Sequence, residues 1–196
     1  MAEKYKSLVI FGPPGIGKGT QAKLLAENKK YFHFSTGEMF RGLQTNPKMA
    51  NSEIGKKVHE LISAGNFVDD KTTIQLFFKT LEEYVKEKKF NPKKQILLLD
   101  GIPRNSNQVE LIQEKIDVVK LIYFFCDDEN ILIERLKKRA VIEGRKDDKE
   151  EVIRKRLEIY KKDTEAVLKK YDESLVLRIN GMGSIEEIRK TVSEKL

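Results

Sequence analysis

The segment GPPGIGKGT, residues 12–20, constrains the fold of this chain more than any other part of its sequence. It directly follows an apolar run at residues 8–11 and precedes a helical pattern, which indicates a turn from a buried strand into a helix. Its glycines remove side chains, so backbone N–H groups can wrap an anion, and the dipole of the following helix favours the same anion. With Lys18 as the added charge, the segment nearly matches the phosphate-binding pattern G-x-x-x-x-G-K-[ST].

The last position of that pattern is a departure. A hydroxyl residue normally stands there to hold Mg²⁺, whereas this chain has Gly19, with Thr20 one place later. The loop is therefore either a broken nucleotide site or a site that holds its metal in another way. A glycine-rich turn without any ligand is the simpler alternative, and the strand–turn–helix context argues against it.

Strand and helix patterns alternate along the whole chain. Further short apolar runs predict strands at residues 31–34, 96–99, 121–125 and 175–179. Helical patterns lie between them, including one long helix at residues 148–171. Alternation of this kind predicts an α/β fold of the P-loop NTPase type, with a doubly wound five-stranded parallel sheet flanked by helices. A length of 196 residues suits a single domain.

Polar and charged side chains follow the ends of several predicted strands. Lys18, Thr36, Arg41, Asp100 and Arg104 all stand just after such an end, and Asp100 closes the apolar run LLLD. Because ligands collect at the carboxyl ends of parallel strands, we expect these residues to face one cleft. An acid at that position beside a phosphate loop is also the expected place for a metal-facing carboxylate.

Helical spacing separates the arginines of the second half of the chain. Arg135 and Arg139 are one turn apart among apolar residues, and Arg156 stands at the edge of an apolar face. Arg154 has acidic neighbours at helical spacing, so we expect it to point to water and form an ion pair. An arginine held against apolar surface is either a packing residue or a positioned anion ligand, and the spacing leaves both open.

Composition narrows the class of partner. Lys and Arg exceed Asp and Glu by 38 − 31 = 7, but the charged runs mix both signs and lack interleaved aromatics. A nucleic-acid partner is therefore not favoured.

No apolar run has membrane-spanning length, and the first residues lead straight into a strand, so we expect neither a membrane segment nor a secretory signal. Cys126 is the only cysteine, which rules out an intrachain disulfide and favours the cytoplasm.

Five motifs together resemble the adenylate kinase family. In chain order they are GPPGIGKGT, STGEMFR, LLLDGIPRNSNQ, RLKKR and GRKDDKEEVIRKRLEIY, and they span nearly the whole sequence. The resemblance implies the Mg²⁺-dependent reaction ATP + AMP ⇌ 2 ADP and a role in adenine nucleotide homeostasis. It also implies one kinase domain with a core at 1–34, 71–138 and 146–196, a nucleoside monophosphate-binding insert at 35–70, and a short lid without zinc at 139–145. GKGT is the form that this family carries, with the metal held by phosphate oxygens and by waters that Asp100 orients.

The resemblance assigns roles by position. Catalytic roles fall on Lys18, Arg104, Arg139, Arg145 and Arg156. ATP binding falls on Gly15, Ile16, Gly17, Lys18, Gly19, Thr20, Arg135, Arg139, Gly181, Met182 and Gly183. AMP binding falls on Thr36, Gly37, Arg41, Phe67, Val68, Gly101, Arg104, Gln108, Arg145 and Arg156. Asp147 matches an acid that helps to fix the arginines. The plain alternative for Asp147 and Asp148 is capping of the long helix at its start, and both roles can hold together.

The choice of monophosphate depends on two residues. Thr36 and Gln108 match the family's adenine-selecting residues, whereas UMP and CMP kinases more often carry Ala and Asn there. A glutamine amide offers both a donor and an acceptor, which suits the adenine edge. Ile102 in place of the usual aromatic and Asp69 in place of Pro or Thr are departures from the family pattern. A UMP/CMP kinase is the alternative function.

Two other classes of protein fit less well. A regulatory GTPase would carry an Asn-Lys-x-Asp signature, which this sequence lacks. A non-catalytic nucleotide sensor would not need so many arginines at phosphate-facing positions. His33, His59 and Cys126 match no catalytic position, and we expect His33 to be an ordinary strand residue. The expected partners are ATP, AMP and ADP, and the expected state is a monomer.

Overall fold

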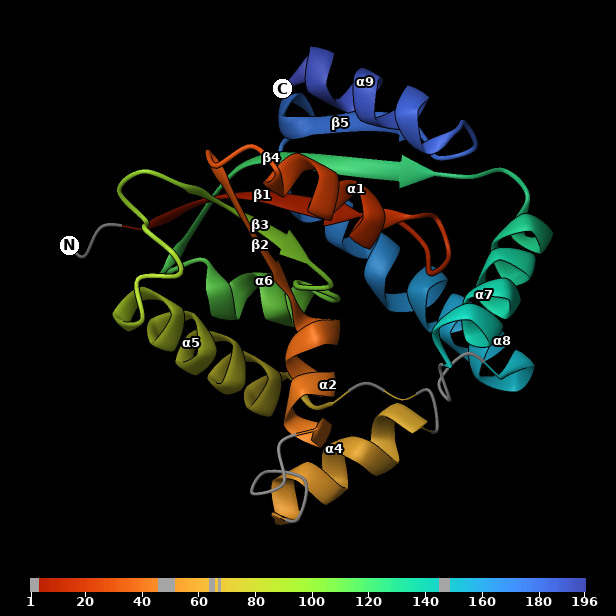
Figure 1. Cartoon of the computed structure of the whole chain (residues 1–196), viewed down its shortest axis with the longest axis horizontal. Coiled ribbons are helices and arrows are strands. Elements are labelled where there is room, and N and C mark those ends of the chain that lie inside the picture. Colours follow the sequence, from red (N-terminus) through yellow and green to blue (C-terminus); the bar gives the residue numbers. More distant parts are fainter. Residues whose placement is uncertain (1–3, 46–51, 64–65, 67, 145–148) are drawn as a thin grey trace.

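The computed structural model describes residues 4–45, 52–63, 66, 68–144 and 149–196. Five strands form one parallel sheet in the order β2-β3-β1-β4-β5 (Figure 1). The strands are β1 (Tyr5–Phe11), β2 (Tyr31–Ser35), β3 (Ile96–Asp100), β4 (Ile116–Phe125) and β5 (Val176–Asn180). This order is that of a doubly wound sheet, so the predicted fold class is confirmed.

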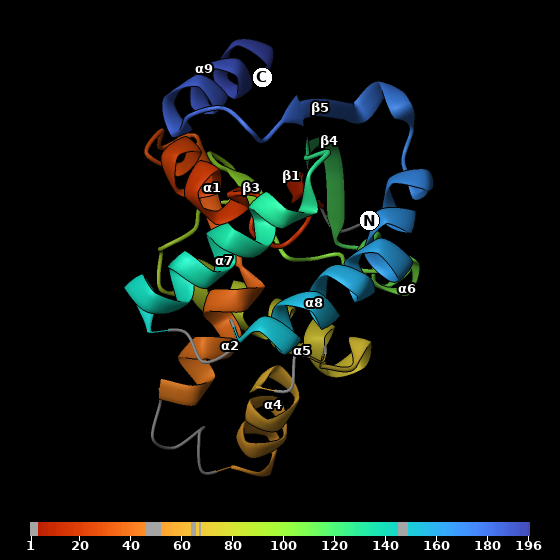
Figure 2. The same ribbon diagram turned by 90° about the vertical axis from the view of Figure 1, so that its right-hand side faces the viewer.

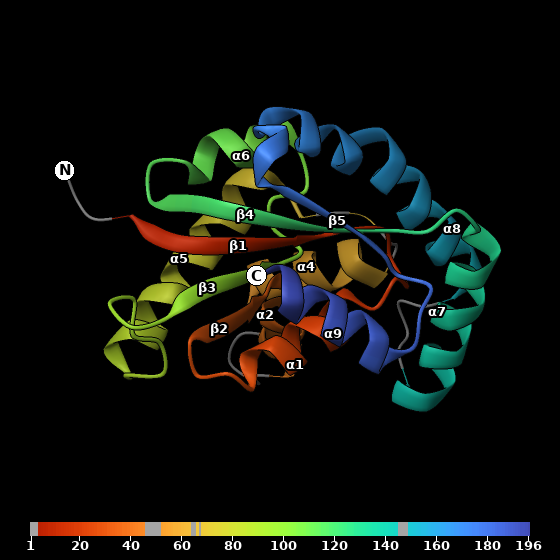
Figure 3. The ribbon, with the colours of Figure 1, turned by 90° about the horizontal axis from the view of Figure 1, so that it is seen from above.

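Helices cover both faces of the sheet. They are α1 (Lys18–Ala26), α2 (Thr36–Thr45), α4 (Glu53–Ser63), α5 (Asp70–Lys86), α6 (Ser106–Ile112), α7 (Glu129–Glu143), α8 (Glu150–Ile159) and α9 (Ile185–Lys195). Three shorter turns, η2 (Tyr160–Thr164), η3 (Glu165–Lys170) and η4 (Glu173–Leu175), lead from α8 into β5. Viewed from above, α1 and α9 lie in front of the sheet and α5 lies behind it (Figure 3).

Alternation of side chains along the strands produces two cores. In β1, Val9 and Phe11 belong to the core under α5 and α6, whereas Leu8 and Ile10 belong to the core under α1 and α9. All four side chains are at most 4% exposed, as expected for a strand covered on both faces. Burial on both faces is the reason that the strands are apolar without a polar alternation.

Two elements differ from the boundaries that the sequence predicted. β4 begins at Ile116, five residues earlier than residue 121. The predicted helix at 148–171 is α8 followed by a π-helical turn and a 3₁₀ segment. Its predicted inward face is still buried, since Ile153, Leu157 and Val167 are at most 2% exposed.

The carboxyl ends of the strands meet at one edge of the sheet. Figure 2 shows this end of the molecule, with α7 and α8 nearest the viewer and α2 and α4 below them. α1, α2 and α7 each follow a strand that ends here. The side chains at the starts of these helices are therefore brought to one place.

Candidate active site

The loop between β1 and α1 leaves the start of the helix open. Gly17, the residue before α1, has φ of 97°, a left-handed conformation that glycine adopts without strain. No side chain caps the first turn, and no acidic residue lies in it. Backbone N–H groups at such a helix start need acceptors, and the helix dipole favours an anion there. Locally, the loop is built to receive a phosphate group.

Lys18 is held inside this loop. Its Nζ donates to the carbonyl oxygens of Gly12 at 2.7 Å and Pro13 at 2.9 Å. Burial lowers the pKa of the Lys18 ammonium to about 8, against the opposing attraction of Asp100, and the cations Arg104 and Arg156 lower it further. An added anion would therefore be bound strongly, because the charge it meets is only partly compensated by the protein.

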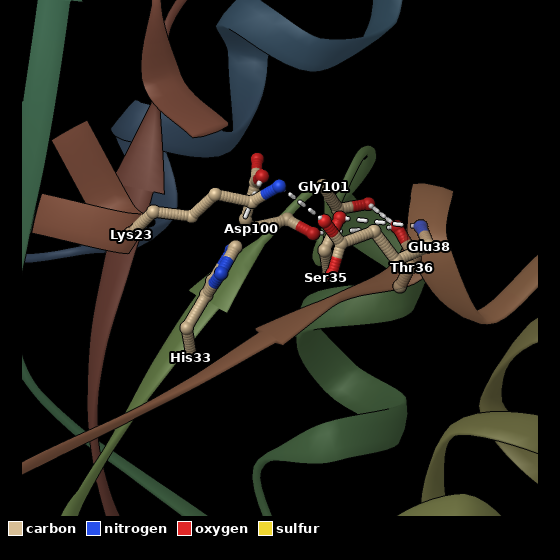
Figure 4. Close-up of polar contacts among 7 residues, drawn as sticks. All are labelled: Lys23, His33, Ser35, Thr36, Glu38, Asp100 and Gly101. Atoms are coloured by element: carbon tan, nitrogen blue, oxygen red, sulfur yellow. Dashed lines mark hydrogen bonds and ion pairs between the residues drawn. The ribbon is translucent and has the colours of Figure 1, made fainter. Parts of the chain in front are cut away.

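Asp100 lies at the carboxyl end of β3, opposite the start of α1. Burial disfavours its charged form, but His33, Lys18 and Arg104 outweigh that effect and hold the pKa of the carboxyl below its usual value. His33 Nε2 lies 3.5 Å from Asp100 Oδ2, a distance that is long for a hydrogen bond (Figure 4). A Cβ at Gly19 would lie 3.5 Å from the same oxygen, so the carboxylate faces the first turn of the helix.

The positively charged residues that follow strand ends in the sequence line one cavity in the structure. A cavity of about 810 Å³ opens at the carboxyl ends of the strands. Its lining includes Asp100 together with the cations Lys18, Arg41, Arg104, Arg135, Arg139 and Arg156. Arg154, two residues before Arg156, is exposed and pairs with Glu150 at 2.8 Å, as its helix face predicted. Helical spacing alone did not decide whether Arg135, Arg139 and Arg156 are packing residues or anion ligands. In the structure, all three line the cavity.

One end of the cavity is formed by α7 and the segment after β5. Arg135 Nη1 donates to the carbonyl oxygen of Gly181 at 3.0 Å, which joins the two elements. A Cβ at Gly181 would come within 2.5 Å of the Ile16 side chain, so only glycine allows the phosphate loop this close. Gly183 lines the cavity, and Met182 contacts Cys126 with 3.0 Å between their sulfurs.

The other end lies between α2 and the segment after β3. Thr36 is 1% exposed, and its hydroxyl donates to the carbonyl oxygen of Gly101 at 3.0 Å (Figure 4). A second, much smaller cavity of about 10 Å³ lies here, lined by Thr36, Phe40, Val68, Thr73, Gly101, Arg104 and Gln108. It shares Gly101 and Arg104 with the large cavity. The residues that the sequence assigned to the acceptor base therefore lie beside those assigned to the phosphates.

The chain is similar in sequence to known proteins along nearly its whole length. Residues 10–176 match the family described as adenylate kinase. This chain belongs to the adenylate kinase family. The adenylate kinase of Prochlorococcus marinus is 36% identical over 197 residues, which cover 96% of this chain and 97% of that relative. The one of Pseudarthrobacter chlorophenolicus is 38% identical, with 96% of this chain and 95% of the relative covered. The one of Maricaulis maris is 35% identical, with 97% and 98% covered.

Membership of this family favours transfer from ATP to AMP over the alternative of a UMP/CMP kinase. The similar proteins are named adenylate kinase, and they match this chain over nearly their whole length.

Three residues with roles expected from the family, Phe67, Arg145 and Asp147, lie outside the described residues. Two departures from the family pattern have plain structural places. Asp69 caps α5 by accepting from the Thr72 N–H at 2.9 Å, and Ile102 is fully buried in the core.

Several residues that line the cavity were not predicted from the sequence as site residues. They are His33, Lys23, Glu38, Glu143, Tyr160 and Thr164. Strand alternation could have found His33, since it stands two residues before Ser35 and faces the same side of β2. Lys23 of α1 and Glu38 of α2 form an ion pair at 2.9 Å across the cavity edge, which no local pattern predicts. Figure 4 shows this pair beside Ser35 and Asp100.

Within residues 4–45, 52–63, 66, 68–144 and 149–196, no group of three or more His, Cys, Asp or Glu side chains could hold a metal ion. In the same part of the chain, no helix is long and apolar enough to cross a membrane.

Proposed function

We propose that this protein catalyses the reversible transfer of a phosphoryl group from ATP to AMP, which gives two ADP. The observation that carries the proposal is the convergence of Lys18 and five arginines, from five different helices or loops, on one cavity beside Asp100. Phosphoryl transfer needs little covalent chemistry from the protein, and it is accelerated mainly by positioning and by neutralising charge. A cavity lined in this way provides both.

The donor is expected at the α1 side of the cavity. Backbone N–H groups around Gly15, Gly17 and Thr20 would wrap the β- and γ-phosphates, with Lys18 as the adjacent charge. The hydrogen bond from Arg135 to Gly181 holds the guanidinium at this end of the cavity, where its planar group could stack against the donor base. Gly19, Met182 and Gly183 complete the assignment on that side, and Ile16 supports the loop from the core, where it is 2% exposed.

The acceptor is expected between α2 and the segment after β3. Arg41 and Arg104 would hold its phosphate, and Val68, Gly101 and Gln108 would surround its base. Gly37 lines the cavity beside Arg41, and a Cβ there would lie 3.1 Å from the Arg41 guanidinium. Arg139 and Arg156, from α7 and α8, line the same cavity. We assign them to the transferring phosphoryl group, where negative charge would develop between donor and acceptor.

Asp100 fits a magnesium ion bound through water. Its carboxylate is kept ionised, faces the first turn of α1 and shares the cavity with Lys18 and Gly19. Mg²⁺ commonly binds through one or two carboxylates together with waters and substrate phosphates, so a single carboxylate beside the phosphate loop is a suitable set. When bound, the ion would neutralise charge on the phosphates of ATP.

No protein base is required for this reaction. The second pKa of a phosphate monoester is about 6, so the attacking oxygen of AMP is already mostly deprotonated at neutral pH. His33 lies in the cavity but contacts Asp100, which gives it a place in holding the carboxylate rather than in taking a proton. The arginines orient the attacking oxygen in line with the bond that breaks.

Closure of the two inserts is expected to exclude water and limit hydrolysis of ATP. We assign the monophosphate insert to residues 35–70, the lid to 139–145, and the core to 1–34, 71–138 and 146–196. Arg145 and Phe67 would act from these inserts, with Asp147 fixing the arginines. Within the described part of the lid segment, residues 139–143 continue helix α7 and bring Arg139 to the cavity.

The proposal is tested by measuring ADP formation from ATP and Mg²⁺ with AMP, dAMP, UMP, CMP and GMP as separate acceptors. AMP should give the highest kcat/KM of the panel. Transfer to UMP or CMP in preference to AMP would contradict the proposed acceptor and the roles of Thr36 and Gln108. Consumption of ATP at one rate with and without any acceptor would contradict kinase function altogether.

We further propose that the protein acts as a monomer in the cytoplasm. A monomer is the state that the resemblance to the adenylate kinase family implies. Size-exclusion chromatography with light scattering would give the mass in solution, and an active dimer at working concentrations would contradict the monomer. Cytoplasmic localisation stays a prediction from the sequence.

A further inference from the structure

Asp70, the first residue of α5, is held by three side-chain amides. Its Oδ1 accepts from Asn105 Nδ2 at 2.9 Å and from Gln108 Nε2 at 2.7 Å. Its Oδ2 accepts from Asn107 Nδ2 at 2.7 Å. All three donors come from the segment that leads into and begins α6, so the carboxylate joins α5 to α6 at the edge of the small cavity.

The Gln108 amide is consequently fixed in one orientation. Its Nε2 donates to the Asp70 carboxylate, and its Oε1 accepts from the backbone N–H of Arg104 at 2.8 Å. A carboxylate can only accept and a backbone N–H can only donate. Turning the amide over would place the Gln108 oxygen against the Asp70 carboxylate and the Gln108 nitrogen against the Arg104 N–H. Because Gln108 is 2% exposed, no water could relieve either conflict.

The fixed amide retains hydrogen-bonding capacity on the cavity side. Each amide nitrogen carries two hydrogens and each amide oxygen has two lone pairs, and Gln108 uses one of each on Asp70 and Arg104. One donor and one acceptor remain, in an order that the protein sets before any base arrives. Gln108 lines the small cavity together with Thr36, Gly101 and Arg104, where the acceptor base is expected.

We propose that Asp70 is a specificity-determining residue, which positions the Gln108 amide so that the acceptor site takes adenine and rejects bases with the reversed donor–acceptor order. The inference rests on the proposed function, since AMP as acceptor defines which order is the productive one. Adenine presents an amino donor at C6 beside the N1 acceptor. Hypoxanthine and guanine present a carbonyl acceptor at C6 beside an N1–H donor, and uracil has the same reversed order. Cytosine has the adenine order, so its rejection depends on size rather than on Asp70.

IMP is the sharpest probe, because hypoxanthine has nearly the shape of adenine and differs from it in this order. The experiment compares the full-length wild type with Asp70→Asn, using AMP and IMP as acceptors at saturating ATP and Mg²⁺. An asparagine at position 70 can accept or donate, so it no longer opposes the turned amide. The ratio of kcat/KM for AMP to that for IMP should fall about tenfold, the size expected for losing one charge-assisted hydrogen bond.

Asn107→Ala is the matched control. It removes the third donor to the same carboxylate, from an exposed residue whose side-chain amide donates to the Asp70 oxygen that Gln108 does not use. Its AMP/IMP ratio should equal that of the wild type. If Asp70→Asn does not fold, Asp70→Ser gives the same comparison, because a hydroxyl can also donate or accept.

The possible outcomes are distinct. A fall in activity by the same factor with AMP and IMP in both Asp70 variants would assign Asp70 a purely structural role and overturn the inference. An equal change of the ratio in Asn107→Ala would also overturn it, since the effect would then not pass through Gln108. Failure of the wild type to use AMP would instead overturn the proposed function.

Discussion

The ammonium of Lys18 donates to the carbonyl oxygen of Gly12 at 2.7 Å, so the charge of the phosphate loop is fixed within the loop itself. The same geometry positions the lysine beside the uncapped first turn of α1. A triphosphate bound there would meet a lysine that needs little reorganisation, which is a property of effective electrostatic catalysis.

Lys18→Met should lower kcat for ATP and AMP by about 100-fold or more, the loss typical of removing one preorganised charge or donor from a transition state. Its melting temperature should change little, because the methionine side chain fills similar space. Lys190→Met is the control, since Lys190 on α9 is exposed and pairs only loosely with Glu194, at 3.9 Å. Equal activity of the two variants would contradict the role of Lys18.

ATP binding should take up a proton through Lys18 in alkaline solution. Burial holds the pKa of the free lysine at about 8, below its ordinary 10.5, and a bound triphosphate would raise it. At about pH 9 the free amine is mostly neutral and the bound one mostly charged, so affinity should fall as pH rises above 8. At neutral pH the lysine is charged in both states, and its proton uptake should vanish.

Titration calorimetry with a non-hydrolysable ATP analogue in buffers of different ionisation enthalpy measures that uptake. Lys18→Met should abolish the alkaline component. Persistence of the same uptake in that variant would assign the proton to another group.

Arg156 and Arg154 form a matched pair on α8. Arg156 lines the cavity, whereas Arg154 is exposed and its ion pair with Glu150 is screened by solvent, so the pair contributes little to stability. Arg156→Ala should lower kcat/KM by about 100-fold or more through lost charge neutralisation. Arg154→Ala should stay within about twofold of the wild type. Comparable losses in steady-state kinetics of the two variants would show that the helix face does not decide the role.

His33→Leu should raise the Mg²⁺ concentration needed for half-maximal activity by a few-fold, because His33 is one of the groups that keep Asp100 ionised and in place. The effect should be modest, since the 3.5 Å contact is weak. Titration of Mg²⁺ at fixed ATP and AMP measures it, with melting curves to confirm folding. A change in kcat at saturating Mg²⁺ with no change in the Mg²⁺ requirement would contradict this positioning role.

The sequence was sufficient for the sheet and for most of the cations that line the cavity. Lys18, Arg41, Asp100 and Arg104 follow strand ends, and parallel strands place their carboxyl ends at one edge, so position in the sequence determined position in space. The Arg156 and Arg154 assignment needed only helical periodicity. In both cases a regular backbone geometry translates spacing into direction.

Contacts between distant segments were not predictable in this way. The Lys23–Glu38 ion pair and the Asp70 amide cluster depend on how helices pack, which spacing within one element does not encode. The π-helical turn at Tyr160–Thr164 was missed for a related reason. Tyr160 and Thr164 keep helical spacing and are both buried, as in a regular helix, so the sequence pattern does not reveal the change of geometry.

The most direct test of the central claim follows the γ-phosphate itself. ATP radiolabelled at the γ-phosphate is mixed with unlabelled AMP, Mg²⁺ and the purified protein, and the products are separated over time. The label should appear first in ADP, at the β-position, with inorganic phosphate far behind. Label that passes only into inorganic phosphate, or that enters ADP no faster than with Lys18→Met, would contradict transfer between two nucleotides in this cavity.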